Sequence, residues 1–157
     1  MVYDLRPIAL CNVVYMIMVK MVGNMMKGLH KVVASNSQSA LLLGRLITDN
    51  ILVAAELGHC LRRKCTTEVG WATLKLDMAK AYDKIEWSFL RKMLEKLGFT
   101  GRLVDLIMNY VTTVHYNILV NGKEAGTVVP SRGLRQGDCQ SPYLFIICAE
   151  GLSILLQ

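Results

Sequence analysis

The sequence predicts an α+β fold, and three observations support this prediction. Apolar residues recur at helical spacing in several segments, as in helices that bury one face. Apolar and polar residues alternate before Asp77, as in a half-buried strand. Two strand-like runs flank Asn121-Gly122, a pair typical of a tight hairpin turn. The predicted order of helices, strand, helices, hairpin and helix fits the α+β class.

Length and composition indicate one domain with a substantial core. The chain has 157 residues, of which 53% are hydrophobic, so a disordered chain is excluded. Its formal net charge is +6. This charge favours an anionic partner, with nucleic acid first, although a modest positive charge also serves solubility alone.

The cysteines predict an intracellular protein. Five cysteines are an odd number with irregular spacing, which argues against a disulfide framework. His59-Cys60 with Cys65 suggests zinc only weakly, because the paired cysteines of structural zinc sites are absent. The longest apolar run, residues 8–19, is too short to cross a bilayer and is interpreted as a buried helix.

The first two helices are predicted from apolar periodicity. The first begins at Asn12 and ends at Gly28, with one inward face: Val14, Ile17, Met18, Met21 and Met25. The second is capped by Thr48 and runs towards Lys64, with Ile47, Ile51, Ala54 and Leu61 inward. Its basic end, Arg62-Arg63-Lys64, fits a solvated helix terminus and a phosphate contact equally well.

Asp77 is predicted to close a strand over residues 71–76, before a tight turn and a helix. A carboxylate at a strand end is held by the sheet, and such oxygen donors suit Mg²⁺. Phosphoryl transfer with two metal ions needs several carboxylates at one point. From spacing alone, the favoured interpretation is that Asp77 is a turn residue and Asp83 a charge at a helix N-terminus.

The second half of the chain predicts two amphipathic helices, a hairpin and a final helix. The first helix presents Phe89, Leu90, Met93, Leu94 and Leu97 and stops at Gly98, and the second presents Leu103, Leu106, Ile107 and Tyr110. Strand-like runs over 115–120 and 123–129 form the hairpin. A turn-rich loop over 130–140 leads to an apolar helix with Ser141 as its cap and Pro142 at its first position.

Four blocks of the chain resemble reverse transcriptases. Asp77-Met-Ala-Lys-Ala-Tyr-Asp83 resembles their Asp-x-x-x-Ala-(Phe/Tyr)-Asp motif. The other blocks resemble further family segments and follow in the family's order: 6–12, 38–40 with 44–50, and 131–138 with 141–145. The likeness is strongest to plant LINE-type (non-LTR) retrotransposons, with the group II intron type as the alternative.

The resemblance implies a role for each matching residue. Asp77 would be the catalytic metal ligand for Mg²⁺, and Tyr82 would exclude a 2′-hydroxyl from the nucleotide site; from its sequence alone, Tyr82 is equally a core aromatic. Arg6 and Arg45 resemble residues near the triphosphate.

The 130–140 loop resembles the family's template-grip segment. Gln136 and Gly137 match positions near the templating base pair, and Arg132 and Arg135 would contact template phosphates. The chain departs from the family at Cys139-Gln140, where Pro-Leu is usual, and at residues 41–43, where Phe-Val-Pro is usual.

The resemblance therefore implies part of a right-hand polymerase fold. Residues 1–69 would be a fingers-like segment and residues 70–157 the first part of the palm. The family's (Phe/Tyr)-Ala-Asp-Asp hairpin and its thumb have no match, so the isolated chain is expected to be inactive.

The implied partners are an RNA template, a DNA primer and deoxynucleoside triphosphates, in the nucleus; no membrane and no stable protein partner are expected. Two alternatives are a basic nucleic-acid-binding module without catalysis and a globular remnant without a ligand.

Overall fold

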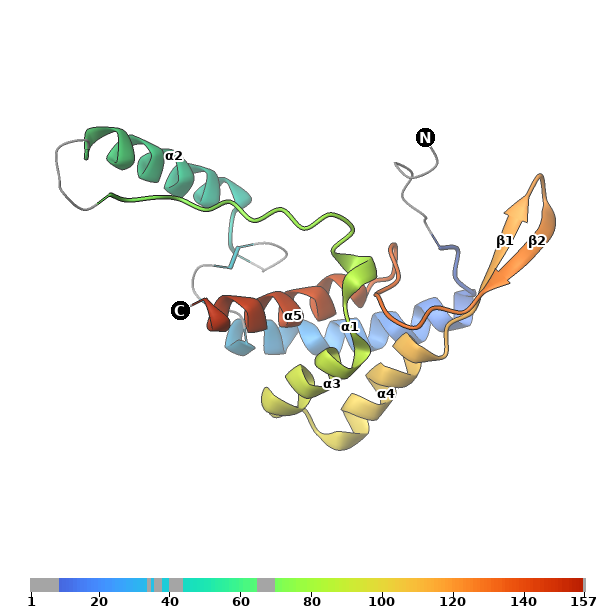
Figure 1. Ribbon diagram of the computed structural model, residues 1–157. Helices are drawn as coiled ribbons and strands as arrows, with labels where there is room; N and C mark the ends of the chain where they lie inside the picture. Colours follow the sequence, from blue (N-terminus) through green and yellow to red (C-terminus); the bar gives the residue numbers. More distant parts are fainter. Residues whose placement is uncertain (1–8, 34, 36–37, 40–43, 65–69, 157) are drawn as a thin grey trace. The chain divides into compact units, whose positions relative to one another are not determined.

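The computed structural model describes residues 9–33, 35, 38–39, 44–64 and 70–156. These form two compact units (Figure 1). The larger unit contains the described residues before Ser35 and those from Lys80 onward, and the smaller unit contains those from Ser35 to Ala79. The predicted boundary between residues 69 and 70 separates the fingers-like segment from the partial palm of the family, and it stays a prediction.

The larger unit is a helical layer with one β-hairpin, in agreement with the predicted mixture of helices and strands. Its helices are α1 (Val13–Val33), α3 (Trp87–Lys96), α4 (Gly101–Thr112) and α5 (Ser141–Leu155). Helix α3 packs against both α4 and α5, and α1 packs against α5. A core between them contains the buried side chains Met26, Leu90, Leu94, Ile107, Leu144 and Ile147.

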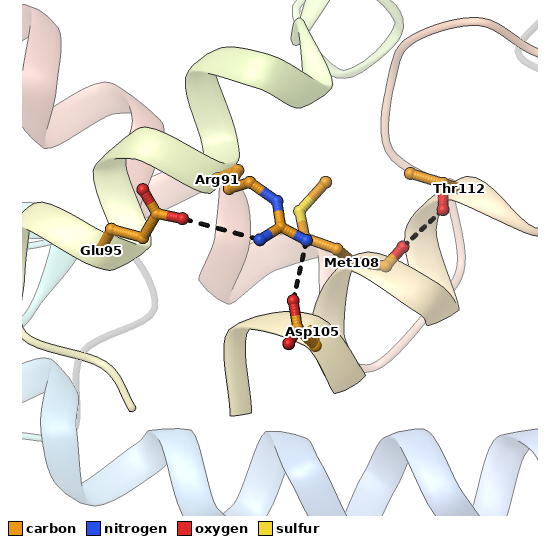
Figure 2. A network of polar contacts seen from close by, with 5 residues as sticks. All are labelled: Arg91, Glu95, Asp105, Met108 and Thr112. Atoms are coloured by element: carbon orange, nitrogen blue, oxygen red, sulfur yellow. Dashed lines mark hydrogen bonds and ion pairs between the residues drawn. The ribbon is translucent and has the colours of Figure 1, made fainter. Parts of the chain in front are cut away.

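Helices α3 and α4 confirm the predicted amphipathic pair. Leu90 and Leu94 of α3 are buried, and Gly98 follows the helix with φ +82°. In α4 the buried residues are Val104, Ile107 and Met108. On the outer side, Arg91 of α3 binds Glu95 of its own helix and Asp105 of α4 (Figure 2). Exposed ion pairs of this kind contribute little to stability, so the apolar contacts hold the two helices together.

The hairpin also confirms its prediction. Strands β1 (Tyr116–Val120) and β2 (Lys123–Val128) pair antiparallel, with Val120 opposite Lys123. Asn121 and Gly122 have φ values of +51° and +77°. Positive φ at both positions is what a type I′ turn requires, and this turn matches the twist of the strands.

The inward face predicted for the first helix is wrong. Helix α1 buries Val19, Val22 and Met26, whereas the predicted inward residues are exposed: Val14, Ile17, Met18, Met21 and Met25. Lys20, Asn24 and Lys27 form a narrow polar stripe, and the rest of the helix circumference is largely apolar, so periodicity does not select which apolar part is buried. The helix also continues past Gly28 to Val33.

The buried face of α1 is the one that contacts the end of the 130–140 loop and helix α5. This face includes Gly23, where a Cβ atom would lie 3.6 Å from both the Cys139 carbonyl oxygen and the Tyr143 ring.

The smaller unit contains helix α2 (Ile47–Arg63) and an extended segment over residues 70–78. The predicted strand over 71–76 is wrong, because none of these residues has strand pairing. Alternation predicts a strand only if a neighbouring strand supplies hydrogen bonds, and in the described part of the chain only β1 and β2 pair. Leu46, not Thr48, occupies the cap position of α2.

Helix α2 has no buried residue among those described, and the predicted inward residues Ile47 and Ile51 are exposed. The predicted inward face of this helix is therefore wrong as well. The described part of this unit contains no second helix on which an apolar face could be buried.

Helix α5 begins one residue earlier than predicted. Ser141 is its first residue rather than its cap, and Gln140 takes the cap position without a side-chain hydrogen bond. Gln140 is 2% exposed, and neither atom of its amide group has a hydrogen-bond partner among the described residues. A buried amide without partners loses its hydration without compensation, which destabilises the fold.

We expect Gln140→Leu to stabilise the chain. Leucine removes the unpaired amide at nearly constant volume, and the gain in the free energy of unfolding should be about 1–2 kcal/mol. Urea denaturation monitored by circular dichroism measures this gain. The control is Gln136→Leu. The Gln136 side-chain amide donates a hydrogen bond to Asp83, so its replacement should not stabilise the chain. A loss of stability in Gln140→Leu would show that the amide has a partner.

Candidate functional site

The candidate site lies where the 130–140 loop docks on the turn over residues 80–86. The Gly133 amide donates a hydrogen bond to the Ile85 carbonyl at 2.7 Å, and the Leu134 amide donates to the Tyr82 carbonyl at 2.9 Å. The Trp87 indole N–H donates to the Gly133 carbonyl at 2.8 Å. These bonds join segments about fifty residues apart in the sequence. They bring Tyr82, near the end of the 77–83 motif, into contact with the 131–138 block.

The docking requires glycine at position 133. Gly133 has φ +92°, and a Cβ atom there would lie 3.0 Å from the Asp83 carbonyl oxygen and 3.1 Å from the Asp83 Cα atom. A side chain would therefore be strained by the backbone conformation and would also collide with the turn. Next to it, Leu134 is buried and inserts the loop into the core.

Tyr82 belongs to the turn, and Gln136 belongs to the loop that docks on it. The Tyr82 ring stacks on Phe145 of α5, with ring centroids 4.7 Å apart and an interplanar angle of 8°. Burial raises the pKa of Tyr82 above the ordinary tyrosine value. The Gln136 amide donates to the Asp83 carboxylate at 3.3 Å. Of the five residues predicted for the nucleotide site, Tyr82 therefore lies in the 80–86 turn and Gln136 contacts this turn.

The two arginines of the loop have different surroundings. Arg132 is exposed and pairs with Glu86 at 3.2 Å. Arg135 is half-buried, with its guanidinium 4.5 Å from the Tyr15 ring centroid and 5.5 Å from that of Tyr116. Its Nη1 atom also lies 2.9 Å from the Cys11 sulfur. Cation–π contacts of this kind hold a guanidinium in place without neutralising its charge.

Tyr15 of α1 fixes the far end of the loop, which the sequence motifs did not indicate. Its hydroxyl donates to the Asp138 carboxylate at 2.8 Å, and the other oxygen of this carboxylate accepts from the backbone N–H of Gln140 at 3.1 Å. Burial, together with the neighbouring Asp138 charge, raises the pKa of Tyr15 above the ordinary tyrosine value. The phenol therefore stays protonated and remains a donor at neutral pH.

A pocket of about 900 Å³ lies beside the loop. Its walls come from the loop, the hairpin, the first residues of α1 and the 80–86 turn, and they include Tyr15, Asp83, Tyr116, Arg135, Gln136 and Asp138. Charged groups and aromatic rings thus line one concave surface. Such a surface suits a ligand with both flat rings and negative charge.

Asp77 and Arg45 belong to the smaller unit, whereas the residues that line this pocket belong to the larger one. Asp77 is exposed in the extended segment of the smaller unit. Arg45, also in that unit, donates to the carbonyl oxygens of Ser35 and Gln38. Arg6 and the candidate zinc ligand Cys65 lie outside the described residues, and Gly137 is exposed with φ +94°.

The described residues provide no group of three or more histidine, cysteine, aspartate or glutamate side chains able to hold a metal ion.

Comparison with protein families matches the reverse transcriptase (RNA-dependent DNA polymerase) family over residues 3–157. The chain belongs to the reverse transcriptase family. The reverse transcriptase chain contains no described helix that is long and apolar enough to cross a membrane.

Three curated relatives contain a similar segment. An uncharacterized 149 kDa protein of transposon TX1 from Xenopus laevis is 28% identical over 97% of this chain and 11% of its own length. A retrovirus-related Pol polyprotein from the type-1 retrotransposable element R2 of Popillia japonica is 27% identical over 61% of this chain and 16% of its own length.

An uncharacterized mitochondrial protein of Arabidopsis thaliana is 61% identical over 27% of this chain and 37% of its own length. The reverse transcriptase chain thus spans between about a tenth and about a third of the relatives that it matches.

We expect Gly133→Ala to undock the loop of this reverse transcriptase chain. The control is Gly98→Ala, because Gly98 has a similar φ of +82° and no atom lies within 4 Å of the place that a Cβ atom would take. The control should lower the free energy of unfolding by about 1 kcal/mol from backbone strain alone. Gly133→Ala should lower it by clearly more, as measured by urea denaturation. Equal effects would contradict the close packing of Gly133 on Asp83.

We expect Tyr15→Phe to lower the free energy of unfolding by about 1–2 kcal/mol at neutral pH, because a hydrogen bond to a carboxylate is lost. The pKa of Tyr15 is raised in the folded state. Its stabilising contribution is therefore complete below the ordinary tyrosine pKa of 10.0 and is lost as the pH rises further.

Denaturation at several pH values measures the difference between the wild type and Tyr15→Phe. The control is Tyr110→Phe, which makes the same chemical change at a hydroxyl for which the described residues provide no hydrogen bond. Equal losses in both variants would contradict a specific role for the bond to Asp138.

Proposed function

We propose that the chain is the part of an RNA-directed DNA polymerase of a non-LTR retrotransposon that holds the template and the incoming nucleotide. The match to the reverse transcriptase family over residues 3–157 is the observation that supports this function most strongly. Two relatives support an origin in a mobile element, because one is named after a transposon and the other after a type-1 retrotransposable element. The plant LINE-type branch is the finer part of the proposal, supported by the 61% identical segment in Arabidopsis thaliana.

Tyr82 would be the residue that excludes a 2′-hydroxyl. Exclusion by steric clash needs a ring that does not yield when a larger substrate approaches. The face-to-face stack on Phe145 supports this role, because it restricts the Tyr82 ring from one side. A core aromatic would show the same stack, so the role rests on the family motif together with the position beside the loop.

Gln136 and Gly137 would contact the nascent base pair. The Gln136 amide is oriented by the Asp83 carboxylate, within the same turn as Tyr82. Gly137 is exposed and has no side chain, so a base pair can approach its backbone closely. These two features support a binding surface for the templating base.

Arg132 and Arg135 would provide positive charge for the template phosphates. Arg132 is exposed and its ion pair with Glu86 is worth little in water, so a phosphate can replace the glutamate. Arg135 is held between two tyrosine rings and would act mainly through its field.

Arg45 and Arg6 would bind the triphosphate. Carbonyl oxygens hold Arg45 without neutralising its charge, which keeps its attraction for phosphate.

Asp77 would be a ligand of Mg²⁺, which in this family supports nucleotidyl transfer. Its carboxylate is exposed and has the donor type that Mg²⁺ prefers. One carboxylate does not make a two-metal site, and no further set of ligands converges in the described part of the chain. A two-metal site would therefore need further carboxylates beside Asp77.

The proposed partners are an RNA template, a DNA primer and deoxynucleoside triphosphates, and the proposed location is the nucleus. The basic formal charge of +6 supports nucleic acid as the partner. The division into a fingers-like segment (1–69) and a partial palm (70–157) within a right-hand polymerase fold belongs to the same proposal.

We expect the chain to bind an RNA–DNA hybrid with strong dependence on salt, and Arg132→Ala to weaken this binding. The loss of one phosphate contact should reduce the slope of log K against log salt by about 0.9. Fluorescence anisotropy with a labelled hybrid at several salt concentrations measures this slope. Arg91→Ala is a matched control, because Arg91 is also exposed and ion-paired, but its partners are Glu95 of α3 and Asp105 of α4 (Figure 2).

Equal effects of Arg132→Ala and Arg91→Ala would contradict a specific site at the loop. Hybrid binding no tighter than the binding of a DNA duplex of equal length would contradict the proposed function. In a primer-extension assay, an RNA-templated product that persists in Asp77→Asn would contradict the role of Asp77.

A further inference from the structure

The smaller unit contains an exposed aromatic ring paired with a cation, which the site described above does not use. Trp71 is 67% exposed in the extended segment that follows α2. The Lys64 ammonium lies over the indole ring, 3.9 Å from its centroid. Tryptophan is normally buried for most of its surface, so a ring left in solvent in this way needs an explanation.

The cation fixes the ring while leaving much of its surface accessible. An ammonium over an indole face is attracted by the electrons of the ring, and tryptophan is the best partner for this contact. Because the ammonium occupies little of the ring and two thirds of the residue remain exposed, a flat ligand can still stack on the indole. The pair is therefore an ordered stacking surface rather than a mobile side chain.

Positive charge is concentrated next to this ring. Arg62 and Arg63 form the basic last turn of α2, and Lys64 caps the helix. All three residues are exposed. The carbonyl end of a helix attracts cations, but the helix dipole falls off within one turn and does not require three of them. An exposed aromatic ring beside several cations is the composition with which proteins bind single-stranded nucleic acid.

We propose that Trp71, with Lys64 and the basic end of α2, binds single-stranded nucleic acid by stacking one base on the indole while the cations contact its phosphates. This inference rests on the proposed function only for the nature of the strand, which would be unpaired RNA. Every base has a π-face, so the contact is independent of sequence. Under this proposal, Arg62-Arg63-Lys64 would contact phosphates rather than form only a solvated helix terminus.

The two tryptophans of the chain allow a direct test. Trp87 is bonded to Gly133, so Trp87→Phe leaves Trp71 as the only indole. We expect a short uridine oligonucleotide to quench Trp71 fluorescence to saturation, because a stacked base quenches indole emission. Inorganic polyphosphate, which has the charge without bases, should compete for binding but should not quench. Equal quenching by both ligands, or oligonucleotide binding without quenching, would overturn the proposal.

A second pair of variants keeps the test valid if Trp87→Phe fails to fold. Trp71→Leu should weaken oligonucleotide binding, measured by anisotropy, about tenfold while polyphosphate binding is unchanged. The control is Leu74→Ala, because Leu74 is 79% exposed in the same extended segment and should have no effect. Lys64→Gln should weaken the binding of both ligands.

The same assays separate this inference from the proposed function. Loss of hybrid binding in Arg132→Ala together with unchanged oligonucleotide binding in Trp71→Leu would overturn the stacking surface alone. Trp71-dependent binding of the oligonucleotide without any preference for the hybrid would support the stacking surface and count against the polymerase. Tight binding to phosphatidylserine vesicles that the oligonucleotide does not displace would overturn the proposal in favour of a membrane surface.

Discussion

The docking of the 130–140 loop on the 80–86 turn is the interaction on which the candidate site depends. Gly133 and Leu134 bond to the backbone of the turn, and the indole of Trp87 bonds back to the loop. Since Leu134 is also buried in the core, the loop cannot leave the turn without exposing apolar surface. The positions of Gln136 beside Asp83 and of Arg132 beside Glu86 follow from this contact.

A second attachment holds the loop from the side of α1. Tyr15 bonds to Asp138, and the guanidinium of Arg135 lies over the Tyr15 ring. A loop fixed at two places loses little further conformational entropy when a ligand binds, so the surface beside it is preorganised. In this attachment the Asp138 carboxylate accepts its hydrogen bond from a neutral phenol rather than from a cation. The positive charge of Arg135 is therefore not used to bind Asp138 and remains beside the pocket.

The sequence predicted those elements whose determinants are local. Asn121-Gly122 specifies its turn by itself, and the apolar stripe containing Leu90 and Leu94 has one possible inward face. Prediction failed where a distant partner decides the outcome. Helix α1 is apolar over most of its circumference, and a strand before Asp77 needs a neighbouring strand that periodicity cannot supply. In the site, the motifs identified Tyr82 and Gln136, whereas the bond between Tyr15 and Asp138 joins residues 123 positions apart and left no local pattern.

Three arginines for which the resemblance implies phosphate contacts have different surroundings in the structure. Arg132 shares an exposed ion pair, which a phosphate would replace at little cost. Arg135 would have to leave two aromatic rings and the Cys11 sulfur to reach a ligand, so we propose that it acts through its fixed charge rather than by direct contact. Arg45 is oriented by backbone carbonyls and retains its full charge. The salt dependence of binding should therefore arise mainly from residues such as Arg132, whereas Arg135 sets the potential of the surface before any ligand arrives.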